Sequence, residues 1–369
     1  MARIKVDLKE RGYDIVIGTD NLAEIGRIVV DEKWGRDIFI VTDPLVNDLY
    51  GDALRKGFRN RAKTLEIARG ERYKNLKVAS QLIDDLVRFG AHRDSLIIAL
   101  GGGVIGDLAG FVAATYMRGI SYIQVPTTLL AQVDAAIGGK TAVNHPKCKN
   151  LIGCFYQPKM VFIDVKTLTT LPARELRTGL AEVVKYGVIE DAEFFKFLEA
   201  NAHHLNTRAF ENEDTLRAAL KLWQTIVTES AKIKARIVEK DEKESGLRMV
   251  LNYGHTVGHA LESLTRYRAY NHGEAVAIGM VAAAMIAHRM RLLDADVVKR
   301  VKELLEKLGL PTEIEGLPAK KIIDALGIDK KVRAGRINFV LPEKLGKVAI
   351  RDNVALDTVK QVLSEMGGK

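Results

Sequence analysis

Three histidines and one glutamate could form a metal site. His255 and His259 are spaced so that both would lie on one face of a helix, and His272 stands at the start of a second helical pattern. Glu182 lies in an otherwise apolar helical run, where a carboxylate needs a partner. Two histidines and one carboxylate that leave an open position form a catalytic zinc set. Each histidine alone is more often a surface or capping residue, and the spacing leaves open which two of the three would bind metal.

A glycine-rich loop is the second feature that could do chemistry. Gly101, Gly103 and Gly106 satisfy the pattern G-x-G-x-x-G between a predicted strand and a predicted helix. Glycine lets the backbone approach a pyrophosphate, and the helix start offers free N–H groups and the positive end of a dipole. Glycine turns often join strands to helices without a ligand, but this strand–loop–helix context favours dinucleotide binding.

The acid that would bind the ribose of such a dinucleotide is less obvious. In a standard Rossmann unit it lies about 20 residues after the glycines, and here that region, 124–134, carries a different motif. Asp43, at the carboxyl end of an earlier predicted strand, is the better candidate. It is equally well explained as a turn-forming residue before Pro44. An acid at this position would repel the extra phosphate of NADP, so we expect NAD.

Several cationic side chains lie close to these motifs. Lys140 follows two glycines in a run of small residues, and Lys185, Lys234 and Arg248 lie near the other candidate residues. Each alone is more often a solvated charge, but as a group they indicate a pocket for a ligand with several negative charges. The formal net charge of +9 suits either solubility or the steering of an anionic ligand.

These residues must be positioned by two kinds of architecture. Short β-rich runs alternate with helical patterns up to about Pro172, which predicts βαβ units and a largely parallel sheet. Long helical stretches dominate afterwards. We therefore predict an α/β N-terminal Rossmann-like nucleotide-binding domain over residues 1–172 and a mainly α-helical C-terminal domain for metal and substrate over residues 173–369. The expected strands are 37–41, 95–100 and 122–125, and the expected helices are 74–89, 107–117, 176–188, 215–238, 255–264 and 273–292.

Composition excludes several classes of protein. The 369 residues exceed one ordinary core, which favours two domains. No apolar run reaches the roughly 18 residues of a membrane span, so no membrane partner is expected. Basic residues are mixed with acidic ones, which disfavours a nucleic-acid partner. Two cysteines, Cys148 and Cys154, cannot form a disulfide framework and indicate a cytoplasmic protein.

Six segments together resemble the 3-dehydroquinate synthase family, a branch of the sugar-phosphate cyclases, from about Val41 to Val340. In this order they are highly specific. They are GGGVIGDLAGFVAATYMRG (Gly101–Gly119), VPTTLLAQVDAAIGGKTAVN (Val125–Asn144), KNLIGCFYQP (Lys149–Pro158), GLAEVVKYG (Gly179–Gly187), KARIVEKDEKESGLRMVLNYGHTVGHALE (Lys234–Glu262) and NHGEAVAIGM (Asn271–Met280).

The resemblance implies cofactors and residue roles. The ligands of Zn²⁺ (or Co²⁺) would be Glu182, His255 and His272. NAD would contact Asp43, Glu71, Lys74, Gly102, Gly103, Val104, Ile105, Gly106, Asp107, Thr127, Thr128, Lys140, Lys149, Thr170 and Leu171. Substrate and catalysis would involve Asp134, Lys140, Asn150, Lys185, Lys234, Arg248, Asn252, His259 and Lys330. Arg118 would reach a phosphate in the neighbouring subunit of a homodimer.

The resemblance also implies the reaction. The substrate would be an anionic sugar phosphate, 3-deoxy-D-arabino-heptulosonate 7-phosphate. Oxidation by NAD, β-elimination of phosphate, reduction, ring opening and an intramolecular aldol step would give 3-dehydroquinate. Another sugar-phosphate cyclase is the main alternative, but those substrates lack the carboxylate that a set such as Lys140, Lys234 and Arg248 suits. A metal-dependent polyol dehydrogenase is the second alternative. The chain departs from the family at Cys148, where glycine is common, and this could alter the loop before Lys149.

Overall fold

The computed structural model describes residues 1–59, 61–206, 210–211, 213–266, 268–326, 332–333 and 336–368. The chain forms two compact units, which are described separately. The first comprises Met1–Leu171 and Glu213–Lys243. The second comprises Pro172–Asn212 and Glu244–Lys369.

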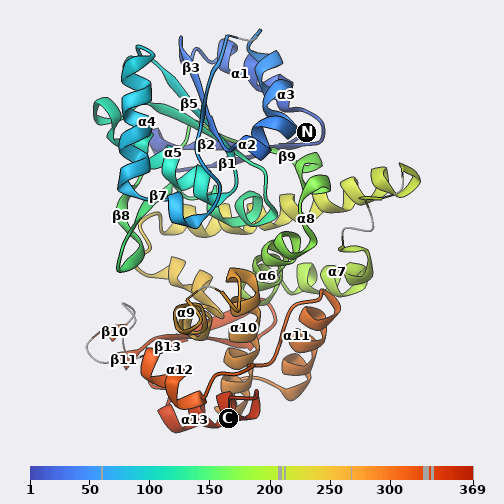
Figure 1. The fold of residues 1–369 in the computed structure, drawn as a ribbon. Helices are drawn as coiled ribbons and strands as arrows, with labels where there is room; N and C mark the ends of the chain where they lie inside the picture. The colour runs from blue at the N-terminus through green and yellow to red at the C-terminus, as the bar shows by residue number, and fades with distance from the viewer. Residues whose placement is uncertain are drawn as a thin grey trace. The chain divides into compact units, whose positions relative to one another are not determined.

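A seven-stranded sheet forms the centre of the first unit (Figure 1). All neighbouring strands are parallel except for the first pair. Every residue of β3, β5 and β9 is buried, as expected for strands that are covered on both faces. This confirms the α/β class predicted for this part of the chain. In order across the sheet the strands are β1 (Ala2–Val6), β2 (Tyr13–Gly18), β9 (Met160–Asp164), β6 (Ser121–Pro126), β5 (Leu96–Gly101), β3 (Ile38–Thr42) and β4 (Lys63–Glu66).

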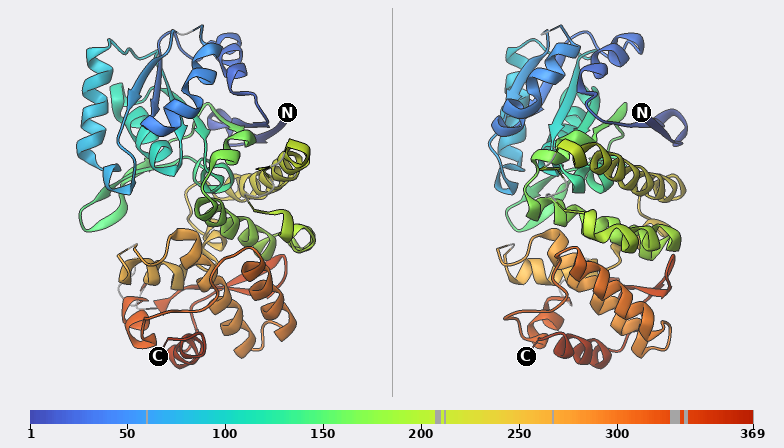
Figure 2. Two further views of the ribbon diagram at one scale, coloured as in Figure 1. Left: turned by 45° about the vertical axis from the view of Figure 1, so that its right-hand side comes forward. Right: turned by 90° about the vertical axis from the view of Figure 1, so that its right-hand side faces the viewer.

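Successive side chains of these strands enter two different cores, as the two-residue period of a strand requires. Phe39 and Val41 pack with residues of α4 and α5. Ile38 and Ile40 pack with residues of α1 and α3. Figure 2 shows helices on both faces of the sheet. The bounds of these helices are Leu76–Arg88 for α4, Gly103–Thr115 for α5, Ile25–Asp31 for α1 and Asp52–Gly57 for α3.

The chain changes its direction of winding between β3 and β5. β3 is followed by β4 on one side, whereas β5 is followed by β6 on the other. Ligands of open α/β sheets bind beside such a switch point, at the carboxyl ends of the strands. Asp43 directly follows β3 and Gly102 directly follows β5. Both parts of the predicted dinucleotide site therefore lie at this switch point.

A β-hairpin that the sequence analysis did not predict also belongs to the first unit. It pairs β7 (Lys140–His145) with β8 (Cys148–Phe155). His145 pairs with Cys148 across a tight turn, and Cys148 does not have a positive φ. The backbone therefore places no demand for glycine at Cys148. Cys148 and Cys154 are both free thiols.

The long helix α8 (Glu213–Lys240) packs with the first unit rather than the second. It contacts β1, β2, η6 (Ala131–Ala135) and η7 (Val165–Thr170). The predicted boundary at residue 172 places this helix in the helical domain, because α8 follows the last strand of the sheet. Helical periodicity identifies which face of a helix is buried but not what packs against that face. The division of the chain therefore differs from the predicted boundary at residue 172.

The second unit is mainly helical, as predicted. Its central helix is α10, which contacts α6, α9, α11, α13 and β12. Among the described residues, no helix is long and apolar enough to cross a membrane. The helices are α6 (Ala173–Ile189), α7 (Ala192–Asn201), α9 (His255–Leu264), α10 (His272–Arg289), α11 (Ala295–Lys307), α12 (Ala319–Leu326) and α13 (Leu356–Glu365). The hairpins are β10 (Val332–Arg333) with β11 (Arg336–Ile337) and β12 (Phe339–Lys344) with β13 (Lys347–Arg351).

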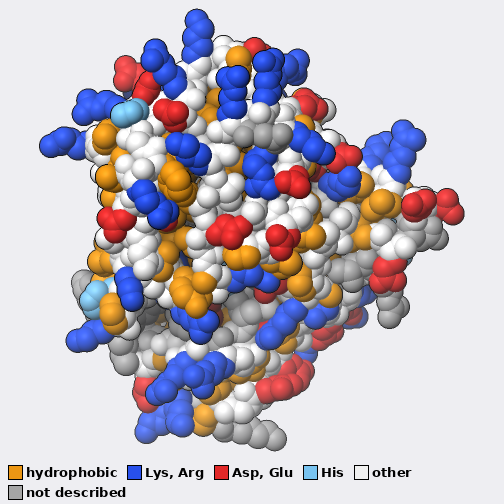
Figure 3. Space-filling view, turned by 45° about the horizontal axis from the view of Figure 1, so that its top comes forward, with side chains coloured by type: hydrophobic (Ala, Val, Ile, Leu, Met, Phe, Trp, Pro, Cys, Tyr) orange, Lys and Arg blue, Asp and Glu red, His pale blue; other side chains and the backbone are white. Residues whose placement is uncertain are grey.

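The surface carries charges of both signs. On the face drawn in Figure 3, Lys and Arg side chains are interspersed with Asp and Glu and separated by apolar side chains. The net charge of +9 is therefore not concentrated in one continuous basic band on that face.

Candidate active site

Helix α6 brings a carboxylate and an ammonium group into the interior of the second unit. Glu182 is 0% exposed and Lys185 is 1% exposed. They are three residues apart on one helical face and form an ion pair through Glu182 Oε2. Mutual neutralisation makes the burial of both charges tolerable, since an unpaired buried charge is very costly.

The start of α9 presents the first histidine to this carboxylate. Gly254 precedes the helix with a φ of 79°, and a Cβ there would lie 2.6 Å from Met280 Cγ and 2.8 Å from Val276 O. Only glycine suits this position. His255 follows, with Nδ1 3.0 Å from Tyr253 O and Nε2 3.5 Å from Glu182 Oε1.

The start of α10 presents the second histidine. Asn271 and Glu274 form a reciprocal capping box at this helix start, and Arg174 grips Glu274 with two hydrogen bonds of 2.8 Å. His272 is thereby held at the first helical position. Its Nε2 lies 3.2 Å from Glu182 Oε1, and its Nδ1 lies 3.4 Å from Glu262 Oε1.

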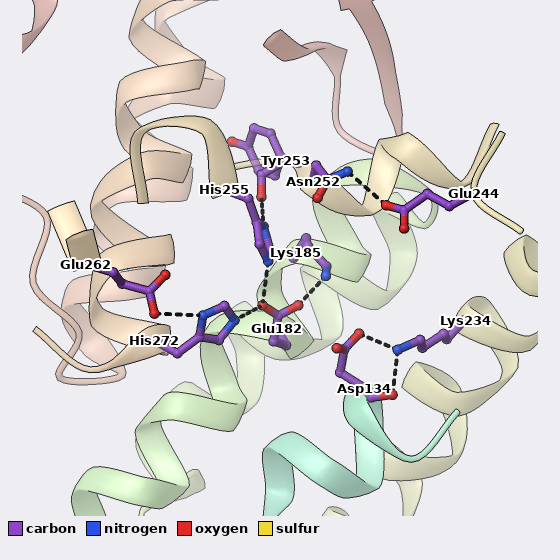
Figure 4. A network of polar contacts seen from close by, with 10 residues as sticks. All are labelled: Asp134, Glu182, Lys185, Lys234, Glu244, Asn252, Tyr253, His255, Glu262 and His272. Atoms are coloured by element: carbon purple, nitrogen blue, oxygen red, sulfur yellow. Dashed lines mark hydrogen bonds and ion pairs between the residues drawn. The ribbon is translucent and has the colours of Figure 1, made fainter. Parts of the chain in front are cut away.

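Glu182, His255 and His272 therefore meet the donor requirements of a metal site. One ligand atom from each lies within 4.8 Å of the other two. Both imidazoles direct Nε2 toward Glu182 and place Nδ1 against an acceptor, which is the usual arrangement of metal-binding histidines (Figure 4). His259 lies beside His255, with ring centroids 5.3 Å apart, but is not part of this group of three.

The two histidines differ in protonation. Burial holds the pKa of His255 well below its usual value, and the cations Lys185 and His272 add to this effect against the opposing Glu182. Burial also disfavours the charged form of His272, but the hydrogen bonds and charges of Glu182 and Glu262 outweigh it and raise its pKa to about 10. Without a metal, His272 therefore favours the cationic form at neutral pH, with a proton on each ring nitrogen.

In the first unit, a second ion pair joins two residues of the predicted substrate set. Lys234 on α8 is 4% exposed, and its Nζ lies 2.7 Å from Asp134 Oδ1 (Figure 4). It also donates to the Asp134 carbonyl. Asp134 lies in η6, which α8 contacts, so the packing of these two elements creates the pair.

A polar network surrounds the buried Lys74. Its Nζ donates to Asp107, in the first turns of α5, and at 2.6 Å to Asn150 Oδ1 on β8. Burial raises the pKa of the Asp107 carboxyl, and the Lys74 ammonium opposes that rise. Asn150 has a φ of 51°, and its backbone N–H donates at 2.8 Å to Asn144 Oδ1. The Nδ2 of Asn144 in turn donates to Glu71 Oε1 at 2.8 Å.

The glycine loop opens α5 without a capping side chain. Gly102 is the N-cap residue, no side chain accepts from the first turn, and that turn holds no acid. Gly106 packs closely against Gln124 on β6, whose Oε1 would lie 2.5 Å from a Cβ at this position and would have to shift to admit one. The free N–H groups and the dipole of this helix start suit an anion.

Of the other predicted cofactor residues, Thr127 and Thr128 lie next to the glycine loop, and Asp43 and Thr170 make contacts elsewhere in the first unit. Asp43 Oδ1 accepts from Val46 N at 3.2 Å and so caps α2 (Pro44–Val46), and Arg69 Nε lies 3.5 Å away. The turn-forming role considered for Asp43 is thus real, but it uses one carboxylate oxygen. Thr127 N donates to Gly101 O at 3.0 Å, and Thr170 Oγ1 lies 2.5 Å from Tyr50 Oη. Thr128 Oγ1 accepts from Ala131 N.

Comparison with known proteins gives a consistent result. The family model described as 3-dehydroquinate synthase N-terminal matches residues 64–178, and the one described as 3-dehydroquinate synthase C-terminal matches residues 179–332. A 3-dehydroquinate synthase of Nostoc punctiforme is 48% identical over 367 residues, which cover 98% of this chain and 99% of that protein. The chain belongs to the 3-dehydroquinate synthase family.

Solved structures of related cyclases share the whole fold. A 2-deoxy-scyllo-inosose synthase complexed with carbaglucose-6-phosphate, NAD⁺ and Co²⁺ has a TM-score of 0.83 and 29% identity, over 99% of this chain and 100% of that chain. A 2-epi-5-epi-valiolone synthase from Streptomyces hygroscopicus with NAD⁺ and Zn²⁺ has a TM-score of 0.85 and 28% identity, over 98% of each chain. The 3-dehydroquinate synthase relative is thus much closer in sequence than either cyclase.

Each unit contains some of the remaining residues that the resemblance to 3-dehydroquinate synthases implies. In the second unit, Arg248 is 1% exposed, and Asn252 Nδ2 donates to Glu244 Oε1 at 3.2 Å. In the first unit, Lys140 and Arg118 are exposed, and Lys149 is half-buried on β8. Lys330 lies outside the described residues.

Two residues that contact the candidate site residues, one in each unit, were not predicted from the sequence. Glu262 contacts His272, and Asn144 links Glu71 to Asn150. Glu262 follows His255 by seven residues and His259 by three on the same helix, so helical spacing alone would have placed it on their face. Asn144 had no comparable signal, because it lies in a hairpin that was not predicted.

Proposed function

We propose that this chain converts 3-deoxy-D-arabino-heptulosonate 7-phosphate to 3-dehydroquinate and phosphate, as a lyase that depends on NAD and a divalent metal. The 48% identity to a named 3-dehydroquinate synthase over nearly the whole chain supports the reaction. The convergence of Glu182, His255 and His272 is the structural observation that carries it. Oxidation of a hydroxyl group of this substrate develops negative charge on its oxygen. This cluster is suited to hold a cation that would stabilise that charge.

Glu182, His255 and His272 would hold Zn²⁺ or Co²⁺. Three protein ligands leave a position for a substrate oxygen. The metal would supply Lewis acidity toward substrate oxygens, and NAD would supply a reversible hydride acceptor. Lys185 would neutralise Oε2 of Glu182. This ion pair leaves Oε1 directed toward His255 and His272.

NAD would be held at the switch point of the sheet. The N–H groups at the start of α5 would bind its pyrophosphate, and the carboxylate of Asp43 would accept from a ribose hydroxyl. Lys74 would hold Asp107 and Asn150 in register through its buried ammonium group. The proposed cofactor set also includes Glu71, Thr127, Thr128, Lys140, Lys149, Thr170 and Leu171.

The substrate carries a carboxylate and a phosphate, and the residues proposed to bind it in each unit are largely cationic or amide groups. Arg248 would grip an oxyanion with two parallel hydrogen bonds, which a lysine cannot do. Lys140, Lys234, Asn150 and Asn252 would provide further donors, and the ion pair with Asp134 orients Lys234. His259, beside His255, is the proposed group for proton exchange with a substrate hydroxyl.

We also propose that the protein is a cytoplasmic homodimer in which Arg118 serves the neighbouring subunit. Met117, Arg118 and Gly119 have φ values of 49°, 67° and 120°, and this sharp turn leaves Arg118 exposed. Mixing an Arg118→Ala variant with a variant inactive at Arg248 should restore part of the activity through mixed dimers. If the protein sediments as a monomer, or mixing restores nothing, this assignment is wrong.

A substrate panel tests the proposed reaction against its alternatives. The heptulosonate phosphate, glucose 6-phosphate and sedoheptulose 7-phosphate would each be supplied with NAD and Zn²⁺ or Co²⁺, and the products identified by mass. We expect phosphate release and a dehydroquinate product from the first compound alone. Turnover of the second or third instead would assign the chain to another sugar-phosphate cyclase activity, and net oxidation without phosphate release would indicate a polyol dehydrogenase.

A further inference from the structure

Glu262 is a buried carboxylate with a defined position beside the proposed metal ligands. It lies on α9, is 5% exposed, and places Oε1 3.4 Å from Nδ1 of His272. The other nitrogen of the same ring lies 3.2 Å from Glu182 Oε1. The imidazole of His272 therefore lies between two carboxylates, one at each nitrogen (Figure 4).

The two proposed histidine ligands are supported in different ways. His255 Nδ1 faces the backbone carbonyl of Tyr253 at 3.0 Å, which is a neutral acceptor provided by the chain next to it. His272 begins α10, and its Nδ1 faces a charged side chain from another helix. Helix α9 thus carries the ligand His255 in its first turn and the support for His272 two turns later.

The chemistry of imidazole explains why such a support matters. A neutral imidazole has one N–H and one lone pair, and an acceptor at Nδ1 keeps the hydrogen there and leaves the lone pair on Nε2. A carboxylate acceptor also fixes the ring plane and increases the basicity of Nε2. Both effects favour a cation at the nitrogen that faces Glu182.

The charges of the cluster lead to the same conclusion. Glu182 and Glu262 contribute two negative charges and Lys185 contributes one positive charge, so these three side chains leave one negative charge. A divalent cation would bring their sum to one positive charge. If Glu262 were neutral, the same cation would bring it to two positive charges in a buried site, which is less favourable.

We propose that Glu262 is a positioning residue for the metal: its carboxylate holds the Nδ1–H of His272 so that Nε2 can bind the cation, and its charge strengthens that binding. This inference rests on the proposed metal site. It assigns no contact between Glu262 and the substrate.

Metal affinity measures this role directly. The full-length protein and its variants would be stripped of metal, and the dissociation constants of Zn²⁺ and Co²⁺ measured by chelator competition. Glu262→Leu removes the acceptor while nearly keeping the volume, and Glu262→Gln keeps an acceptor oxygen but removes the charge. Glu199→Gln is the matched control, because Glu199 is a partly buried carboxylate of the second unit that pairs with Arg300. His255→Ala identifies the metal that is bound at the proposed site.

We expect Glu262→Leu to weaken both metals about 10–100-fold, the range for loss of such a support. Glu262→Gln should weaken them less, and the visible spectrum of its Co²⁺ complex should differ from that of the parent. Glu199→Gln should bind both metals like the parent. If Glu262→Leu does not fold, Glu262→Gln decides, because a rise of its dissociation constant above about threefold supports the role.

Parent-like affinity and an unchanged Co²⁺ spectrum in folded Glu262 variants would overturn the inference, even if their metal-free forms melt at a lower temperature. That result would show a structural role only and would leave the metal site intact. If the parent protein binds no metal that His255→Ala loses, the metal site itself is wrong, and the inference fails with it. The two failures are therefore distinguishable.

Discussion

Gly254 offers a quantitative test of how the fold positions His255. Its φ of 79° costs an L-residue about 1–2 kcal/mol. A Cβ at this position would lie 2.6 Å from Met280 Cγ and 2.8 Å from the backbone oxygen of Val276. Relief of such overpacking costs about 1–3 kcal/mol. Alanine also narrows the unfolded ensemble, which returns about 0.4–1 kcal/mol.

Gly254→Ala should therefore lower the free energy of unfolding by about 1–5 kcal/mol. Gly316→Ala is the control, because Gly316 has a φ of 69° but no atom within 4 Å of a built Cβ. The control carries the conformational terms without the collision, so the two variants should differ by about 1–3 kcal/mol. Urea unfolding of the metal-free proteins measures this difference.

The same substitution should disturb the metal site. Gly254 directly precedes His255, so a shift of α9 that relieves the collision moves this proposed ligand. We expect Gly254→Ala to bind Zn²⁺ about tenfold more weakly or worse, as other disturbances around metal ligands do, and Gly316→Ala to bind it normally. Equal stability losses in both variants, or unchanged metal affinity in Gly254→Ala, would refute the reasoning.

Four further outcomes are expected. Exhaustive chelation should abolish activity, and Zn²⁺ or Co²⁺ should restore it; full activity in a metal-free preparation would contradict this. The pKa of His272 is raised to about 10 in the metal-free protein, so metal binding at pH 8 should release about one proton from this ring, and the affinity for the metal should rise with pH. Titration calorimetry in buffers of different ionisation enthalpy measures the released proton. Arg248→Lys keeps the charge but loses the paired hydrogen bonds, so kcat/KM should fall by a factor that corresponds to about 2–4 kcal/mol of transition-state binding. The dissociation constant of NAD should stay unchanged; an unchanged kcat/KM with weaker NAD binding would remove Arg248 from the substrate set. Asp43→Ala should weaken the binding of NAD and reduce the preference for NAD over NADP. The substitution also leaves the Arg69 guanidinium, which lies 3.5 Å from the Asp43 carboxylate, without that partner. Equal use of NAD and NADP by the parent protein would exclude the proposed contact between Asp43 and the ribose.

The parts of the fold that could be predicted have strong local signals. The helix expected over 255–264 coincides with α9 (His255–Leu264), because Gly254 precedes its first residue and its apolar residues recur with helical spacing. The strands expected over 37–41, 95–100 and 122–125 coincide with β3, β5 and β6 to within one residue, because their residues are almost continuously apolar. The other sheet strands β2, β4 and β9 were not among those expected. The helix expected from Asp107 begins at Gly103 instead. Glycine is a poor helix former, but the close packing of Gly106 against Gln124 and of Gly110 against Thr141 favours small residues in this helix, and these tertiary contacts override propensity.

The parts that could not be predicted depend on contacts between distant segments. None of the residues of β8 in the β7–β8 hairpin is buried, so this strand shows no hydrophobic alternation. Spacing could not choose between His255, His259 and His272, because that choice depends on where α6 places Glu182. The residue type and helical phase of Glu262 were visible, but its contact with His272 requires the packing of α9 against α10.

The cofactor balance during phosphate release tests the central claim most directly. The protein would be supplied with metal, excess 3-deoxy-D-arabino-heptulosonate 7-phosphate and NAD at a small fraction of the substrate concentration. Released phosphate and the absorbance of NADH would be followed in the same sample. The proposed redox-neutral cyclisation predicts that phosphate release exceeds the NAD supplied many times over and that no NADH accumulates. Phosphate release that stops when the NAD is used up, or NADH that rises in step with the product, would contradict it.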